Sequence, residues 1–140
     1  MKKRYFYILL CVISLCIGGG LYIIFRPNTY VAEFARGVFP SANTIFSSLE
    51  EINCVFIKYY FPDLIWAFSL NCGLNAIFNS KKSIFINSGI VLGIGALWEI
   101  SQHLSIVSGT GDFIDLAMYL CGILLIIIPE TIIMLKQKSR

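Results

Sequence analysis

The sequence predicts an all-α membrane protein, a polytopic bundle of four transmembrane helices with one amphipathic helix at the extracytoplasmic membrane interface. Hydrophobic residues make up 57% of the 140 residues and charged residues only 14%, compared with roughly 25% charged residues in a soluble domain. The mean hydropathy of +0.78 means that an aqueous fold of this length cannot bury all the apolar side chains. The third observation is that most basic residues lie in three clusters beside the apolar segments. We expect a single domain over residues 1–140.

The positions of the basic residues predict the orientation in a cell membrane. Eight of the eleven Lys and Arg residues form three clusters, namely Lys2, Lys3 and Arg4, then Lys81 and Lys82, and last Lys136, Lys138 and Arg140. Basic clusters beside transmembrane segments mark the cytoplasmic side. Both termini are therefore expected in the cytoplasm. No cluster is long or interleaved with exposed aromatic residues, so nucleic acid is not an expected partner.

The first predicted span covers residues 5–25, which contain no charged residue. At 1.5 Å per residue these 21 residues cover the hydrocarbon core of about 30 Å. A basic start and an apolar run are also typical of a signal peptide. Here the run is long and no small-x-small cleavage site follows Gly20, so we expect it to be retained.

Residues 42–60 predict the interfacial helix. Apolar residues recur at helical spacing, and charged or polar residues occupy the opposite side; the apolar positions are Ile45, Leu49, Ile52, Phe56 and Tyr59. Spanning would place Glu50 and Glu51 in lipid, which favours a helix in the membrane interface. A helix packed over the mouth of the bundle is the alternative.

The second span is predicted over residues 62–79, with Pro62 at a first helical position and Asp63 near the positive end of the helix dipole. Asp63, Ala67, Asn71 and Asn75 follow one another at four-residue spacing, which places three polar residues on one helix face. Because amides in lipid have no partners, this face is expected to hydrogen-bond with other helices.

The third and fourth spans are predicted over residues 83–103 and 112–135, joined by a polar turn. In the third, Gly89 and Gly93 form a small-xxx-small face that predicts close helix packing.

The start of the fourth span predicts a capping residue, Thr110 or Asp112. Near its other end, Pro129 predicts a kink, and Glu130 is expected to pair with Lys136.

Ionisable residues gather at the predicted outer ends of these spans. By helical rise, Glu99 lies roughly 26 Å beyond Lys82 and Asp115 roughly 31 Å before Lys136. Because such groups are expensive next to lipid, they indicate a functional site. The candidate polar-site residues are Asp63, Glu99, Gln102, His103, Asp112 and Asp115.

Several chemistries remain open for this site. Glu99, His103, Asp112 and Asp115 are residue types that ligate divalent ions. Carboxylates with His103 can perform acid–base hydrolysis of a lipid head group, although the absence of a nucleophile motif favours binding over catalysis. A hydrogen-bonded clasp between helix ends and non-covalent recognition of a polar ligand complete the alternatives.

No cofactor or resident metal is predicted. The five cysteines show no CxxC spacing and are expected to be free and apolar in character. The lipid bilayer is the one partner that composition requires, and association with a second copy or another protein stays open.

Residues 62–126 resemble the VanZ-like family of small polytopic bacterial membrane proteins. The resemblance rests on E-x-x-Q at Glu99 and Gln102, a short polar loop, and Asp115 followed seven residues later by Gly122. The family usually has arginine in the loop and asparagine four residues after the aspartate, where this chain has Ser108-Gly109-Thr110 and Tyr119. The family is named for a teicoplanin-resistance protein. The resemblance therefore implies action at the cell surface on a cell-wall lipid or a glycopeptide, with lowered susceptibility to teicoplanin-type antibiotics.

Overall fold

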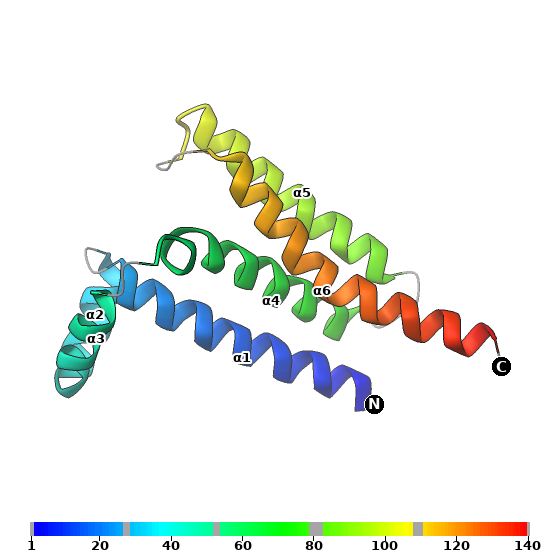
Figure 1. Ribbon diagram of the computed structural model, residues 1–140, viewed down its shortest axis with the longest axis horizontal. Helices are drawn as coiled ribbons and strands as arrows, with labels where there is room; N and C mark the ends of the chain where they lie inside the picture. The colour runs from blue at the N-terminus through cyan, green and yellow to red at the C-terminus, as the bar shows by residue number, and fades with distance from the viewer. Residues whose placement is uncertain (1, 27–28, 52–53, 79–82, 108–110, 140) are drawn as a thin grey trace.

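The computed structural model describes residues 2–26, 29–51, 54–78, 83–107 and 111–139, and these residues form helices and no strand (Figure 1). The α-helices are α1 Lys2–Phe25, α2 Tyr30–Val38, α3 Asn43–Glu50, α4 Phe61–Ile77, α5 Ser83–His103 and α6 Phe113–Lys138. A 3₁₀ turn η1, Pro40–Ala42, precedes α3, and a π-helical stretch η2, Phe56–Tyr60, precedes α4. Lys81, Lys82 and the turn with Thr110 lie outside the described residues. The all-helical class is confirmed.

Three of the helices are long and apolar enough to cross a membrane. They are α1 from Lys3, α5 and α6, with 23, 21 and 26 residues. The remaining predicted span, the second, corresponds to α4, which has 17 residues and is therefore about 26 Å long. In α6 the helix continues through Pro129.

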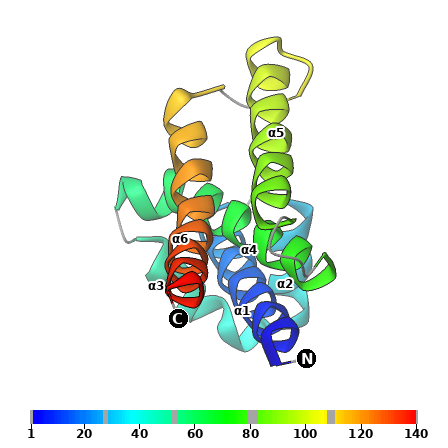
Figure 2. The same cartoon turned by 90° about the vertical axis from the view of Figure 1, so that its right-hand side faces the viewer.

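Helix α4 is the centre of the bundle and packs against α1, α5 and α6. Figure 1 shows α1 on one side of α4 and the pair α5 and α6 on the other. The start of α1 and the end of α6 lie at one end of the molecule (Figures 1 and 2), which we call the terminal end. We call the opposite end the distal end, where α1 and α5 finish and α4 and α6 begin.

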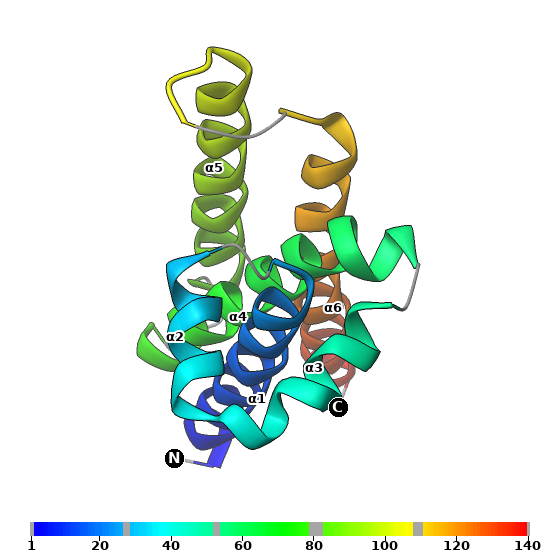
Figure 3. The same ribbon diagram turned by 90° about the vertical axis from the view of Figure 1, so that its left-hand side faces the viewer.

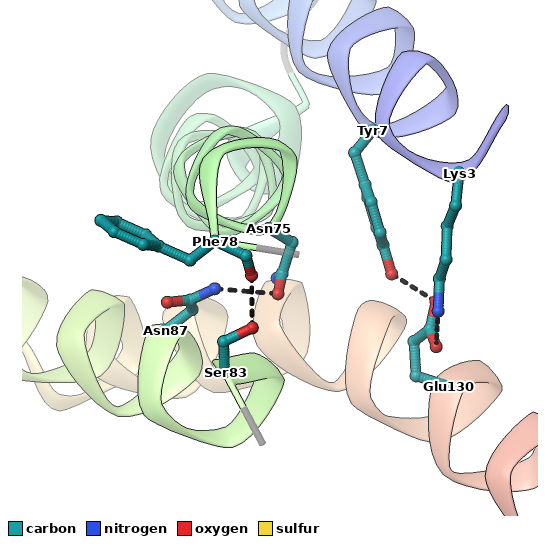
Figure 4. A network of polar contacts seen from close by, with 7 residues as sticks. All are labelled: Lys3, Tyr7, Asn75, Phe78, Ser83, Asn87 and Glu130. Atoms are coloured by element: carbon teal, nitrogen blue, oxygen red, sulfur yellow. Dashed lines mark hydrogen bonds and ion pairs between the residues drawn. The ribbon is translucent and has the colours of Figure 1, made fainter. Parts of the chain in front are cut away.

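The predicted polar face of α4 is confirmed as a set of interhelical hydrogen bonds. Asn71 and Asn75 are 0% and 1% exposed. The Asn71 amide donates to the Ser88 hydroxyl over 3.0 Å, and the Asn87 amide donates to the Asn75 carbonyl oxygen over 3.0 Å (Figure 4). Asn75 in turn donates to the backbone carbonyl of Asn71. These bonds, which average about 0.6 kcal/mol each in a membrane, fix the register of α4 on α5.

The predicted close-packing face of Gly89 and Gly93 is wrong. Both glycines are exposed, and a Cβ added at either would meet no atom within 4 Å. The close approaches are at Gly95, which lies under the ring of Tyr119, and at Gly122, where a Cβ would lie 2.5 Å from the Leu64 carbonyl oxygen. Sequence spacing identifies small residues on one face, but it does not identify the face that meets a neighbour.

The predicted pairing of Glu130 with Lys136 is also wrong. Glu130 is buried and accepts a hydrogen bond from the Lys3 ammonium over 2.6 Å and another from the Tyr7 hydroxyl (Figure 4). Lys136 follows Glu130 by six positions, which places it on a different side of α6. The contact joins α1 to α6 at the terminal end, and we call it the terminal clasp.

The segment predicted as one helix over 42–60 is divided. The structure ends α3 at Glu50, with Glu51 as its C-cap, and resumes helical structure at η2. Two adjacent acids at the negative end of a helix dipole disfavour its continuation. An additional helix, α2, precedes it. Both α2 and α3 lie crosswise at the end of α1 (Figure 3).

Candidate functional site

Three helices bring polar side chains to the distal end. Asp63 lies in the first turn of α4, Glu99 in the last two turns of α5, and Asp115 in the first turn of α6. Asp112 is the N-cap of α6, where its carboxylate accepts a hydrogen bond from the Ile114 amide over 3.0 Å. This confirms Asp112 as a capping residue.

Glu99 is the residue that connects these segments. One carboxylate oxygen accepts a hydrogen bond from the Tyr119 hydroxyl over 2.8 Å, and the other accepts one from the Asp112 backbone amide over 3.0 Å. Hydrogen bonds to a charged group contribute about 1.5–3 kcal/mol each. Glu99 thus connects the end of α5 to two points that follow the loop, the Asp112 amide and the Tyr119 hydroxyl.

Tyr119 extends the connection to α4. Its side chain is 2% exposed and lies between Gly95 and the ring of Trp66, whose centroid is 5.7 Å away. The hydroxyl also lies 3.4 Å from a carboxylate oxygen of Asp63. Because a phenol has one hydrogen, the shorter bond to Glu99 takes it, and the contact with Asp63 is weaker. We call Asp63, Glu99, Asp112, Asp115 and Tyr119 the distal polar cluster.

Asp115 adds a further carboxylate to the cluster, and Arg26 places one cation near it. Asp115 is half-buried and lies within electrostatic range of Asp63, Glu99 and Asp112. Arg26, the residue after α1, lies within electrostatic range of Asp63 and Asp115. A cation from α1 therefore offsets part of the repulsion among the carboxylates.

Gln102 and His103 lie apart from these contacts. Gln102 is half-buried and His103 is exposed, and no side-chain hydrogen bond joins either to a residue that the structure describes. Glu99 is held by Tyr119 and the Asp112 amide. Gln102 and His103 remain candidates on sequence grounds alone.

Sequence reasoning missed Tyr119 and Arg26 as members of the site. The signal for Tyr119 was available, since it lies four residues after Asp115 on the same face of α6 and Gly95 lies four residues before Glu99. Arg26 is the first charged residue after an uncharged run of 21 residues, which places it at the distal end of α1.

The chemistry of the cluster is that of hydrogen-bond acceptors. Within the described ranges, no group of three or more His, Cys, Asp and Glu side chains could hold a metal ion. Because each carboxylate oxygen can accept two hydrogen bonds, Glu99 keeps part of its acceptor capacity beside its two bonds within the chain, and more of the capacity left for a ligand lies on Asp63 and Asp115. Such carboxylates suit the amines, amides and hydroxyls of a polar ligand.

No family model matches the chain, and no curated protein or solved structure matches it significantly. The likeness to the VanZ-like family thus rests on its motif residues, of which Glu99 and Asp115 belong to the distal polar cluster.

Proposed function

We propose that this chain is a VanZ-like membrane protein with four spans, cytoplasmic termini and the distal polar cluster at the outer membrane face. Support for counting α4 as a span comes from its position, because it lies between α1 and α6 in Figure 1 and begins and ends at the same two ends of the bundle. Support for the orientation comes from Lys3, Arg4, Lys136 and Lys138, all at the terminal end. Positive residues remain on the cytoplasmic side.

At the outer face, the protein lowers susceptibility to teicoplanin-type glycopeptides by non-covalent recognition of a polar ligand, either the glycopeptide or its cell-wall lipid target. The observation that carries this proposal is the contact of Tyr119 with both Glu99 and Asp63. This contact holds the carboxylates of Glu99 on α5 and Asp63 on α4 near Asp115 and Arg26. Recognition needs such prearranged polar groups, because ordering them on binding would cost affinity.

One alternative, a structural clasp, is favoured by a specific observation. Both carboxylate oxygens of Glu99 are already hydrogen-bonded within the chain. A carboxylate held by two such bonds stabilises the helix ends and has less acceptor capacity left for a ligand than Asp115. In this alternative the protein is a structural subunit of the membrane.

Two variants separate these functions, because one removes a charge and the other weakens hydrogen bonds. Asp115 takes part in no side-chain hydrogen bond with the described residues, so Asp115→Asn removes a charge with little structural cost. Glu99→Gln replaces a hydrogen-bonded carboxylate and tests the clasp. Glu33→Gln, at an exposed acid on α2, is the matched control.

The experiment expresses the wild type and the three variants in a sensitive Gram-positive host and measures teicoplanin susceptibility together with membrane abundance. Recognition predicts that Asp115→Asn abolishes the susceptibility shift at unchanged abundance, whereas Glu33→Gln retains it. The structural alternative predicts reduced abundance for Glu99→Gln and no effect of Asp115→Asn. A wild type that is abundant and causes no shift would remove the resistance function.

A further inference from the structure

Helix α2 turns an apolar face away from the protein, whereas a helix on a water-soluble protein buries such a face. Tyr30, Phe34 and Val38 recur every four residues on one face and are 91%, 74% and 51% exposed. Ala32 and Arg36, about 160° around the helix from this face at 3.6 residues per turn, point inward. Ala32 is 0% exposed and Arg36 is half-buried.

The contacts of α2 fix this orientation. The Arg36 guanidinium lies 5.9 Å from the ring centre of Phe46 on α3, and Asn43 donates a hydrogen bond to the Arg36 carbonyl over 3.5 Å. At the start of α2, the Thr29 hydroxyl accepts from the Ala32 amide and donates to the Arg26 carbonyl over 2.9 Å. Arg36 is thus held against α3, and the face with Tyr30, Phe34 and Val38 is turned away from the protein.

Two features of the fold identify what covers the apolar face. Helix α1 buries only 11% of its most apolar window inside the protein, so much of its surface is left for lipid. Four residues separate the end of α1, which lies at the distal end, from the start of α2. Helix α2 runs across the end of α1 (Figures 1 and 3). Its apolar face therefore begins where the lipid-covered surface of α1 ends.

We propose that α2 lies in the interfacial layer of the leaflet in which α1 ends, with Tyr30, Phe34 and Val38 inserted among the lipid chains. Its nine residues are about 14 Å long, far too short to span. An exposed apolar face and aromatic residues at the end of a span are typical of helices that lie in the interface. The inserted helix anchors the distal end of α1.

A second copy of the chain is a poorer fit to this surface. The rings of Tyr30, Phe34 and the adjoining Phe39, together with the Val38 side chain, supply roughly 500–600 Å² of apolar surface. A stable protein interface takes about 800 Å² from each partner.

The experiment places the photoreactive phenylalanine analogue benzoylphenylalanine at one position at a time in the full chain, reconstituted in phosphatidylcholine vesicles. Position 34 tests the apolar face and enlarges an already exposed aromatic residue, so the fold is retained. Position 33 is the matched control, because Glu33 is also exposed on α2 but lies about 100° around the helix from the neighbouring Phe34. Position 9 is the lipid-facing reference, since Leu9 on α1 is 56% exposed.

The photoproducts are identified by intact mass. The proposal predicts a phospholipid adduct at position 34 comparable with that at position 9 and at least about fivefold above position 33, because interfacial helices insert one face only. Adducts at position 34 with the mass of a second chain would overturn it in favour of a dimer. So would equal labelling at positions 33 and 34, or no lipid adduct at 34 in vesicles where position 9 reacts.

Discussion

Gly122 is where α6 approaches the backbone of α4 most closely, and Gly122→Ala is expected to destabilise the bundle. The added Cβ would lie 2.5 Å from the Leu64 carbonyl oxygen and 3.0 Å from the Phe68 amide nitrogen. Ordinary contact begins at 3.4 Å, so the Leu64 oxygen and the Cβ must separate by about 0.9 Å. Because both obstructing atoms belong to the backbone, no side-chain rotation relieves the overlap, and the two helices must move apart.

The expected loss follows from two opposing effects. Overpacking of this kind costs about 1–3 kcal/mol, and replacing glycine by alanine within a helix returns about 0.5–1 kcal/mol. The free energy of unfolding should therefore fall by about 1–2 kcal/mol. Gly93→Ala is the matched control on α5, because no atom lies within 4 Å of its added Cβ, and it should leave stability unchanged or slightly raised.

Both variants are unfolded by titration with sodium dodecyl sulfate in mixed micelles, and helix content is followed by circular dichroism. A transition for Gly122→Ala at lower detergent fraction than for the wild type and Gly93→Ala is the expected result. Equal loss in both variants, or a larger loss for Gly93→Ala, would refute the packing of α4 against α6 described above.

Three further substitutions test separate hydrogen-bonded contacts by the same titration. Glu130→Gln weakens the terminal clasp and should cost about 1.5–3 kcal/mol; in a double-mutant cycle with Lys3→Met, the two losses should not add, and full additivity would mean that the pair does not interact. Asn75→Leu leaves the Asn87 amide without its acceptor and should cost about 1–3 kcal/mol, whereas an unchanged midpoint would show that the amide finds another partner. Tyr119→Phe keeps the ring over Gly95 but removes the donor to Glu99, so a loss of about 1.5–3 kcal/mol is expected, and a neutral result would contradict that bond.

The parts of the fold that the sequence predicts are those governed by local spacing and by the cost of polar groups in lipid. Asn71 and Asn75 lie four residues apart, so they share a face, and an amide without water requires a partner helix. That reasoning needs no knowledge of the partner. The same logic places Glu99 and Asp115 at one end, because helical rise determines height along a span.

The parts that it does not predict depend on which helices are neighbours. Glu130 pairs with Lys3, which is 127 positions away, and local spacing gives no information about that distance. Gly93 and Gly122 look alike in sequence, but only Gly122 meets a backbone. For α2, the apolar face is visible in the sequence, but its outward direction is set by contacts of Arg36 and Asn43 with their neighbours.

The terminal clasp has a consequence for biogenesis. Helix α1 is synthesised before α6, so Lys3 and Tyr7 are part of the chain well before the carboxylate that they bind exists. In the complete fold α1 is also connected to α4, where the Ser69 hydroxyl donates to the Cys11 carbonyl. When α6 packs, Glu130 reaches its two donors, the Lys3 ammonium and the Tyr7 hydroxyl. The last helix to be made therefore completes this contact, and a chain that ends before residue 130 lacks the terminal clasp.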